Sequence, residues 1–186
     1  MSWVWNRLLD IIQLKEYSLK HTHRIAVMGL EGAGKSTLIK CVRNRNDDES
    51  GISEILLGDI VYTLVEITIE NDEVSCIDLS GYDAIIYVVD LTDTYNLGLN
   101  KKEFHMLVEN EDVILTPVLI VGTKCDLGYS MTSTDFCHLL DVTCTGKSDD
   151  SMLDITIRPL EFFRCSVVQR TGIGEAFHWL TNQLQN

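Results

Sequence analysis

Short apolar segments alternate with stretches of helical periodicity along most of the chain. Apolar runs predict β-strands at 24–28, 62–69, 73–77, 84–89, 118–121 and 161–168. Apolar residues at helical spacing predict helices at 35–43, 99–108, 134–140 and 173–184. The strands at 62–69 and 73–77 are expected to form a hairpin that turns at Asn71-Asp72. Strands that alternate with helices predict a doubly wound, mostly parallel α/β sheet flanked by helices.

The N-terminal segment has a different pattern, with apolar side chains on one wide face of a predicted helix at 3–14. Arg7, Lys15, Lys20 and Arg24 outnumber the acidic residues of this region, so the segment is locally basic. A helix of this kind lies in a membrane surface or packs on the protein's own core. We expect residues 1–20 to form an N-terminal amphipathic membrane-binding helix and residues 21–186 to form a single domain. The side chains expected to enter the membrane are Trp3, Val4, Trp5, Leu8, Leu9 and Ile12.

Composition limits the remaining possibilities. The chain has 186 residues, of which 45% are hydrophobic, and this suits one compact core. Its net charge of −13 argues against nonspecific binding to nucleic acid. No window reaches the ~18 consecutive apolar residues of a spanning helix. The six cysteines are scattered without C-x-x-C spacing, which predicts reduced thiols in a reducing compartment.

A glycine-rich loop joins the first strand and the first helix of the predicted domain. Residues 29–36 read Gly-Leu-Glu-Gly-Ala-Gly-Lys-Ser and fit the phosphate-binding pattern G-x-x-x-x-G-K-[ST]. Such glycines let backbone N–H groups turn toward phosphate oxygens at a helix N-terminus. Lys35 is expected to reach the β- and γ-phosphates, and the Ser36 hydroxyl to coordinate Mg²⁺. The predicted nucleotide-binding residues here are Glu31, Gly32, Ala33, Gly34, Lys35, Ser36 and Thr37.

A second phosphate motif, D-x-x-G, follows the predicted strand at 73–77. It reads Asp78-Leu-Ser-Gly81. At this distance after a phosphate-binding loop, the motif predicts that Asp78 holds Mg²⁺ through water and that the Gly81 amide senses the γ-phosphate.

A base-recognition motif follows the buried strand at 118–121. Thr123-Lys124-Cys-Asp126 matches N-K-x-D with threonine in place of asparagine. Asp126 accepts two hydrogen bonds from the N1–H and exocyclic amine of guanine, a pair that adenine does not offer. The motif therefore predicts a guanine nucleotide, with Thr123 expected to weaken the link to the phosphate-binding loop.

Further motifs resemble the Sar family of small GTPases. Residues 158–161 (Arg-Pro-Leu-Glu), 165–167 (Cys-Ser-Val) and 172–180 (Gly-Ile-Gly-Glu-Ala-Phe-His-Trp-Leu) are similar to that family's C-terminal signature. The opening Met-Ser-Trp-Val-Trp resembles its hydrophobic start, and residues 29–37 resemble its loop G-L-D-N-A-G-K-T-T. The resemblance covers nearly the whole chain and implies a P-loop NTPase fold of the small GTPase type.

The resemblance also implies a function. It implies a GTP hydrolase that binds GTP or GDP with Mg²⁺, and whose GTP form inserts its N-terminal helix into the ER membrane. The implied task is recruitment of the COPII coat for ER-to-Golgi transport, from the cytosolic face of the ER and of Golgi membranes. The implied partners are the inner coat with its GTPase-activating (GAP) subunit, an ER membrane-bound exchange factor and the lipid bilayer surface. Backbone donors to guanine O6 are implied at Ser166, Val167 and Val168.

Three departures from the family pattern bear on this switch. The family reads D-L-G-G-H, so Tyr82 stands where the family has the histidine that positions the attacking water, and slow or altered hydrolysis is expected. Most of the family's switch II is absent, because Asp83 runs directly into the strand at 84–89. This predicts lost coat and GAP binding, or it reflects a mis-spliced transcript or gene model. The Mg²⁺-binding threonine of switch I falls on Asp59, or after a loop shift on Ser53 or Thr63.

Two functions therefore compete. The first is an active Sar-type GTPase in which Gly81 and Tyr82 serve catalysis and a partner completes the site. The alternative is a degenerate protein that binds guanine nucleotide without significant hydrolysis and acts through protein contacts. An ATP-using kinase or motor is disfavoured, because it leaves Asp126 unexplained.

Overall fold

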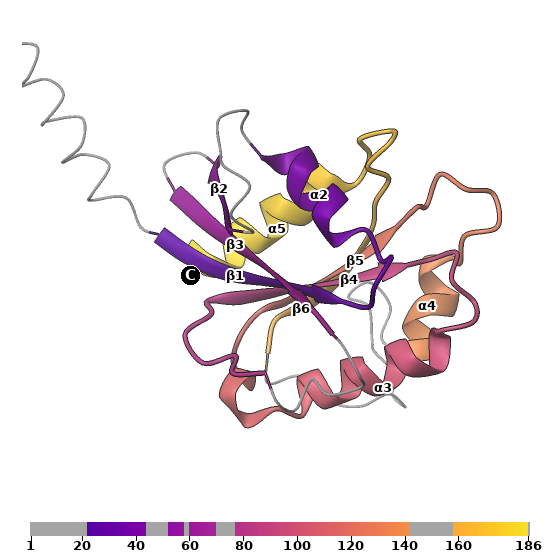
Figure 1. The fold of residues 1–186 in the computed structure, drawn as a ribbon, viewed down its shortest axis with the longest axis horizontal. Coiled ribbons are helices and arrows are strands. Elements are labelled where there is room, and N and C mark those ends of the chain that lie inside the picture. Colours follow the sequence, from indigo (N-terminus) through magenta and orange to yellow (C-terminus); the bar gives the residue numbers. More distant parts are fainter. Residues whose placement is uncertain (1–21, 44–51, 58–59, 70–76, 142–157, 186) are drawn as a thin grey trace, which may run out of the picture.

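Six strands form one sheet at the centre of the described part of the molecule (Figure 1). The structure is a computed structural model that describes residues 22–43, 52–57, 60–69, 77–141 and 158–185. The strand order is β2-β3-β1-β4-β5-β6, with β2 and β3 antiparallel and all other neighbours parallel. This confirms the predicted α/β class. The strands are β1 (Thr22–Gly29), β2 (Ile52–Leu57), β3 (Ile60–Thr68), β4 (Ala84–Asp90), β5 (Val118–Thr123) and β6 (Leu160–Arg164).

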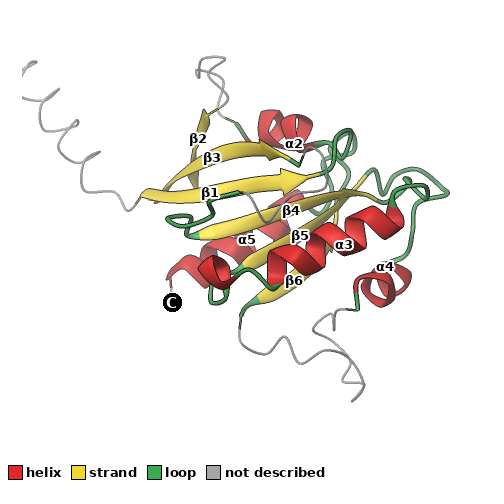
Figure 2. Ribbon diagram, turned by 60° about the horizontal axis from the view of Figure 1, so that its bottom comes forward, coloured by secondary structure: helices red, strands yellow, loops and turns green. Residues whose placement is uncertain are grey.

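Helices cover both faces of the sheet (Figure 2). α2 and α5 pack on one face, and α3 and α4 pack on the other. The predicted helices of the domain are confirmed to within two residues at each end. They are α2 (Lys35–Val42), α3 (Leu97–Val108), α4 (Ser133–Leu140) and α5 (Ile173–Gln185), with a short 3-10 helix η2 (Glu111–Val113) after α3.

Strand β4 illustrates why the central strands are continuous apolar runs. Ile85, Tyr87 and Val89 belong to the core under α3 and α4, whereas Ile86 and Val88 belong to the core under α2 and α5. Successive side chains of a strand point to opposite faces, so a strand covered on both faces has no solvent-facing side.

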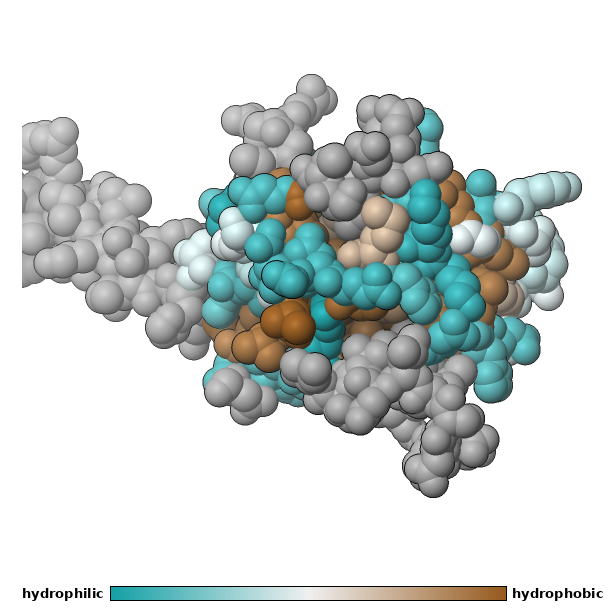
Figure 3. Space-filling view, turned by 90° about the horizontal axis from the view of Figure 1, so that it is seen from below, coloured by the Kyte–Doolittle hydropathy of each residue, from teal (hydrophilic) through white to brown (hydrophobic). Residues whose placement is uncertain are grey.

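Helix α3 shows the opposite arrangement, because only one of its faces is covered. Phe104 and Leu107 are buried against the sheet, whereas Lys102 and the C-cap residue Glu109 are exposed. Seen from this side, hydrophilic groups extend across the middle of the surface with hydrophobic groups beside them (Figure 3). The amphipathic pattern of the helix therefore matches its position on the outside of the sheet.

The first part of the sheet differs from the prediction. The antiparallel partner of β3 is β2, which precedes it, and β2 was not predicted. β3 ends at Thr68, and Ile77 lies in no strand. The prediction of a second hairpin strand at 73–77 is therefore wrong for Ile77, and its other residues lie outside the described part of the chain. The expected strand at 161–168 also ends early, at Arg164.

Several expectations fall outside the described residues. These are the N-terminal helix with its membrane-facing side chains, the turn at Asn71-Asp72, and Asp59. No helix among the described residues is long and apolar enough to cross a membrane. Cys41, Cys125 and Cys165 are free thiols, as predicted, but Cys137 is disulfide-bonded, so the prediction of reduced thiols is wrong for that residue.

Candidate nucleotide-binding site

The phosphate-binding loop of residues 29–36, the P-loop, leaves the sheet where β1 ends and enters α2 after five residues (Figure 1). Gly29, Gly32 and Gly34 all have positive φ, at 146°, 76° and 98°. A side chain at Gly29 would also meet the Val88 carbonyl oxygen, which lies 2.2 Å from the Cβ position. Glycine is therefore required to turn the loop over the end of β4 and into the helix.

Lys35 lies at the start of α2 with its ammonium group directed back into the loop. Its Nζ donates hydrogen bonds to the carbonyl oxygens of Gly29 and Leu30, both at 2.9 Å. Burial lowers the pKa of Lys35, and the nearby carboxylates of Glu66 and Glu31 oppose that shift. The phosphate groups of a nucleotide act in the same sense as these carboxylates, because they favour the charged amine.

A polar cavity of about 730 Å³ opens beside Lys35. Its size lies within the roughly 300–1,000 Å³ of typical ligand sites. Ala33 is buried beneath the loop, and the other predicted P-loop residues border the cavity. The lining residues are Glu31, Gly32, Gly34, Lys35, Ser36, Thr37, Glu66, Thr68 and Ile69.

The predicted base-recognition loop is tied to the P-loop by two side chains. Thr123 is buried, and its Oγ1 donates to the Ala33 carbonyl at 2.7 Å and to the Val89 carbonyl at 3.1 Å. Lys124 Nζ lies 3.2 Å from the Gly32 carbonyl and 2.5 Å from an Asp90 carboxylate oxygen. Threonine at 123 therefore keeps a direct hydrogen bond to the P-loop, contrary to the weakened link expected from the sequence.

Asp90 anchors Lys124 from the end of β4. Burial alone would raise the pKa of the Asp90 carboxyl, but hydrogen bonds from Lys124 and Thr92 outweigh it and hold the pKa below its ordinary value. The ion pair is therefore intact at neutral pH. It fixes the Lys124 side chain alongside the P-loop.

Asp126 is partly exposed, and its carboxylate has no hydrogen-bond partner among the described residues. It follows Lys124, whose positive φ of 58° turns the chain at the end of β5. A carboxylate held at a strand end with both oxygens free suits the paired donors of a guanine edge.

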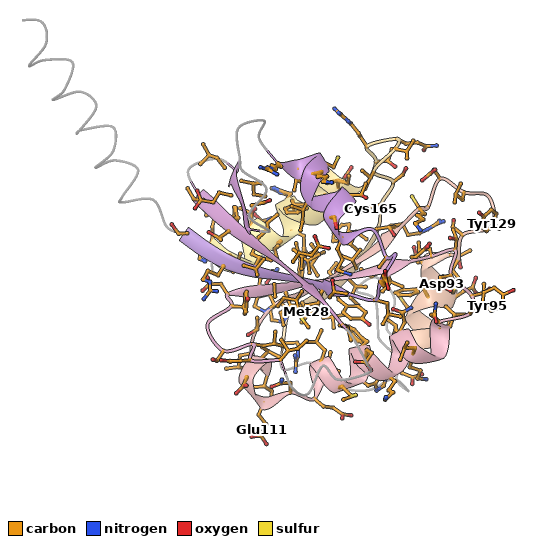
Figure 4. All side chains as sticks on the ribbon, viewed as in Figure 1. Met28, Asp93, Tyr95, Glu111, Tyr129 and Cys165 are labelled. Atoms are coloured by element: carbon orange, nitrogen blue, oxygen red, sulfur yellow. The ribbon has the colours of Figure 1, made fainter. Side chains whose placement is uncertain are left out.

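The loop after β6 lies beside the base-recognition loop. The Cys125 amide donates to the Cys165 carbonyl at 3.3 Å, and Figure 4 shows Cys165 on the side of the sheet that carries α2. The Ser166 amide is used within its own loop, because it donates to the Thr171 carbonyl at 3.0 Å. The Ser166 amide is therefore already bonded, and it does not fit the predicted role of a donor to guanine. Val167 and Val168 have amides without a partner among the described residues.

The D-x-x-G motif leads to the opposite end of the parallel strands, the N-terminal edge of the sheet, where β1 and β4 begin. Arg24 and Asp83 exchange hydrogen bonds, with the Asp83 amide at 2.8 Å from the Arg24 carbonyl. Gly81 lies next to the Arg24 guanidinium, and the Tyr82 ring packs against that group at 4.9 Å. Arg24 is five residues before the end of β1, or about 16 Å from the P-loop at 3.3 Å per residue. The expectation that Gly81 and Tyr82 serve catalysis is wrong for this arrangement.

Asp78 also differs from its predicted placement beside the metal. It is exposed, it does not border the cavity, and its carboxylate accepts hydrogen bonds from the amide and hydroxyl of Ser80 at 2.9 and 2.6 Å. These hydrogen bonds lower the pKa of Asp78. The physical reason is chain length. β4 runs parallel to β1 and begins at the Ile25–Ala84 pair, near the N-terminal end of β1. The chain must therefore reach that end before Ala84, and only a short segment separates Asp78 from Ala84.

The two residues predicted as alternatives to the Mg²⁺-binding threonine of switch I are also remote from the P-loop. Ser53 and Thr63 lie within paired strands, Ser53 opposite Leu64 and Thr63 opposite Arg24. Thr68 is the β3 residue opposite the P-loop end of β1, so Thr63 is about 16 Å away along the strand. The hydrogen-bonded register of the strands excludes either residue from the cavity.

The residue that sequence reasoning missed is Glu66. The Ser36 hydroxyl donates to Glu66 Oε1 at 2.7 Å, so a carboxylate stands beside the hydroxyl predicted to bind Mg²⁺. A period-two alternation along β3 places Tyr62, Leu64 and Glu66 on one face, and this signal was available from the sequence. Hydroxyl and carboxylate oxygens next to a phosphate-binding loop fit Mg²⁺.

Comparisons with known proteins agree with this geometry. A model of the ADP-ribosylation factor family matches residues 9–184. The small COPII coat GTPase SAR1 of Giardia intestinalis is 30% identical over 176 residues, which cover 86% of this chain and 88% of that protein. ADP-ribosylation factor-like protein 1 of Drosophila melanogaster is 25% identical over 179 residues, covering 88% of this chain and 89% of that protein.

A solved structure shares the fold. It is the Arl6 BBS3 small GTPase from Trypanosoma brucei with bound nucleotide analogue GppNp. The TM-score is 0.73 at 21% identity, and the match covers 88% of this chain and 98% of that one. The sheet order, the P-loop and the base-recognition loop together define a P-loop nucleotide-binding protein of the small GTPase class.

The chain belongs to the ADP-ribosylation factor family, because that family's model spans nearly all of it. As a member of this family it is a GTP hydrolase that binds GTP and GDP with Mg²⁺. Glu31, Gly32 and the residues from Gly34 to Thr37 line the cavity, and Lys124 bonds to the Gly32 carbonyl. Their contacts with the phosphates, and those of Lys124 and Asp126 with the base, stay predictions.

Proposed function

We propose that this GTPase is a Sar-type switch that starts COPII coat assembly at the endoplasmic reticulum. The relative that supports this is the small COPII coat GTPase SAR1 of Giardia intestinalis, at 30% identity over 86% of the chain. The C-terminal signature at 158–161, 165–167 and 172–180 supports it as well. ADP-ribosylation factor and factor-like proteins match at 25–27% identity, so another membrane switch of the same family is the main competitor.

Membrane attachment in this proposal depends on the N-terminal amphipathic pattern. Trp3, Trp5, Leu8 and Ile12 would enter the cytosolic leaflet of the ER membrane, or of a Golgi membrane, in the GTP form. An ER membrane-bound exchange factor would load GTP, and the inner COPII coat with its GAP subunit would read the loaded state. These partners and this location rest on the resemblance to the Sar family.

The observation that carries the switch function is the connection between the phosphate and base loops. Thr123 and Lys124 bond to carbonyl groups of the P-loop, so a guanine held by Asp126 is at a fixed position relative to the phosphates held by Lys35. Such a site binds GTP and GDP with one geometry for the base, and it leaves the γ-phosphate as the difference between the two states.

A second candidate has its own observation. Gly81 and Tyr82, the residues expected to serve hydrolysis, lie at the far edge of the sheet. The alternative is therefore a protein that holds guanine nucleotide, hydrolyses it very slowly without a partner, and acts through protein contacts. A partner that supplies a catalytic group would convert this alternative into the first proposal.

The test is a liposome experiment with full-length protein. GTP turnover is measured with and without vesicles of ER-like lipid composition, and with and without the inner coat and its GAP subunit. Binding of the GTP-loaded protein to floated vesicles, retention of the coat, and GAP-stimulated turnover are expected. GTP-dependent vesicle binding without coat retention would contradict the COPII role and favour another membrane switch. Tight guanine binding with no turnover in any condition would favour the second candidate.

A further inference from the structure

We propose that Glu66 supplies the carboxylate that holds the Mg²⁺ of the bound nucleotide, the role that the sequence motif gave to Asp78. Two placements carry the proposal. Glu66 lines the cavity next to the P-loop, and its Oε1 accepts a 2.7 Å hydrogen bond from the Ser36 hydroxyl. Asp78 is outside the cavity and is engaged with Ser80.

The backbone fixes Glu66 at this position. It lies two residues before the end of β3 and pairs with Val27 of β1, two residues before the P-loop begins at Gly29. Both strands are in the interior of the sheet, so their register is set by hydrogen bonds on each side. The carboxylate is therefore directed from a rigid strand at the first turn of α2.

The charges near Glu66 indicate a cation. A carboxylate beside the phosphates of a nucleotide is unfavourable unless a positive ion stands between them. Mg²⁺ in nucleotide sites is bound through one or two carboxylates, a hydroxyl and the phosphates, with water completing the octahedron. Ser36 and Glu66 present that oxygen pair, and Lys35 lies in the same cavity to meet the phosphate charge.

Glu31 is the other carboxylate that lines the cavity, and it offers a matched comparison. It is exposed on the P-loop itself, whereas Glu66 is partly buried and bonded to Ser36. A general effect of negative charge in the cavity would be shared by both residues. A specific role in holding the metal belongs to Glu66 alone.

The experiment measures how fast a fluorescent GDP analogue leaves full-length protein as free Mg²⁺ is varied. The variants are Glu66→Gln, Glu31→Gln and Asp78→Asn. Glutamine keeps an oxygen that accepts the Ser36 hydrogen bond and removes only the charge. Loss of a residue that orders a metal typically costs about 10- to 100-fold in metal affinity, so E66Q should shift the Mg²⁺ midpoint upward by that factor. D78N should keep the midpoint of the unmodified protein, and E31Q, which removes a charge from the P-loop side of the cavity, should shift the midpoint by less than E66Q does.

A second measurement separates metal binding from a structural role. Mn²⁺ replaces Mg²⁺, and its binding to the GDP-loaded protein is followed by electron paramagnetic resonance, with thermal unfolding recorded on each variant. Weaker Mn²⁺ binding in E66Q with an unchanged melting temperature supports the proposal. An unchanged midpoint in E66Q, an equal shift in E31Q, or a shift in D78N alone would overturn it. Nucleotide release is measured in solution without coat or membrane, so the outcome is independent of the proposed COPII role.

Discussion

The two ends of the parallel strands carry motifs that look equally functional in the sequence, yet among the described residues the polar cavity lies at only one of them. At the C-terminal edge of the parallel strands, the P-loop, Glu66 and the base-recognition loop converge. At the N-terminal edge lies the D-x-x-G motif, whose residues contact Arg24. Ligands of open α/β sheets bind outside the carboxyl ends of the strands, so a phosphate motif has meaning only at that edge.

The interactions at the two edges differ in strength as well. Lys35 and Thr123 are almost fully buried and bond to backbone carbonyls, which makes their loss costly. At the other edge, the His23–Asp83 pair is 3.5 Å apart and partly exposed, and exposed pairs of this kind contribute little. Substitutions should therefore have large effects at the C-terminal edge and small ones at the N-terminal edge.

The largest effect is expected from Lys35→Ala. Removing one partner of a buried charged interaction costs roughly 2–5 kcal/mol, which weakens GDP and GTP binding by roughly 30- to 4,000-fold. Isothermal titration calorimetry measures the loss. Lys40→Ala is the control, because Lys40 lies on the same helix but is exposed. Similar losses in the two variants would contradict a phosphate role for Lys35.

Asp126→Asn should change the preferred base. The neutral amide no longer accepts two hydrogen bonds from guanine, and losing hydrogen bonds to a charged group costs about 1.5–3 kcal/mol, or roughly 10- to 100-fold in affinity. Xanthine carries a carbonyl where guanine carries its amine, so the variant should gain affinity for xanthosine diphosphate. Competition between the two nucleotides for the protein measures both changes.

The control for that experiment is Asp112→Asn on η2, a segment that Figure 4 shows, at Glu111, well away from the P-loop. It should leave the base preference unchanged. A base preference that stays with guanine in Asp126→Asn would place the base elsewhere on the molecule.

A smaller effect is expected from Thr123→Val, which keeps the shape of the side chain and removes its hydroxyl. The Ala33 and Val89 carbonyls then lose a donor, and leaving buried polar groups unpaired costs about 1–3 kcal/mol. The free energy of unfolding should fall by that amount in a urea titration, and GDP should leave faster. Thr94→Val, at an exposed position of the loop after β4, should change neither quantity.

Much of the C-terminal edge could be predicted because its signals are local. The P-loop pattern lies between a strand and a helix, and the base motif directly follows the buried strand β5. Each segment determines its own geometry through its glycines and apolar runs, and Gly29 cannot be replaced without meeting Val88. A local pattern with its neighbouring elements was therefore enough to predict that Lys35 starts α2 beside the cavity and that Asp126 lies in the loop after β5, while their contacts with a nucleotide stay predictions.

The N-terminal edge could not be predicted because its placement depends on distant parts of the chain. The end of β3 at Thr68 is set by pairing with β1 and β2, and the start of β4 is set by pairing with Ile25. Between these fixed points the chain must return to the N-terminal ends of the strands, and Gly81 and Tyr82 lie beside Arg24 at the end of that return, just before β4. The same register brings Glu66 to Ser36.

The smallest effects are expected from Tyr82, and they test the comparison between the edges most directly. Tyr82→Leu removes a cation–π contact with Arg24 that contributes about 0.5–1 kcal/mol at exposed sites, so the free energy of unfolding should fall by about that much. Tyr82→His introduces the histidine of the Sar-type motif, yet it should leave GTP turnover unchanged, because the side chain stays beside Arg24. Single-turnover hydrolysis measures this. Faster hydrolysis in Tyr82→His would mean that residues 78–82 reach the γ-phosphate, and the separation between the two edges would no longer hold.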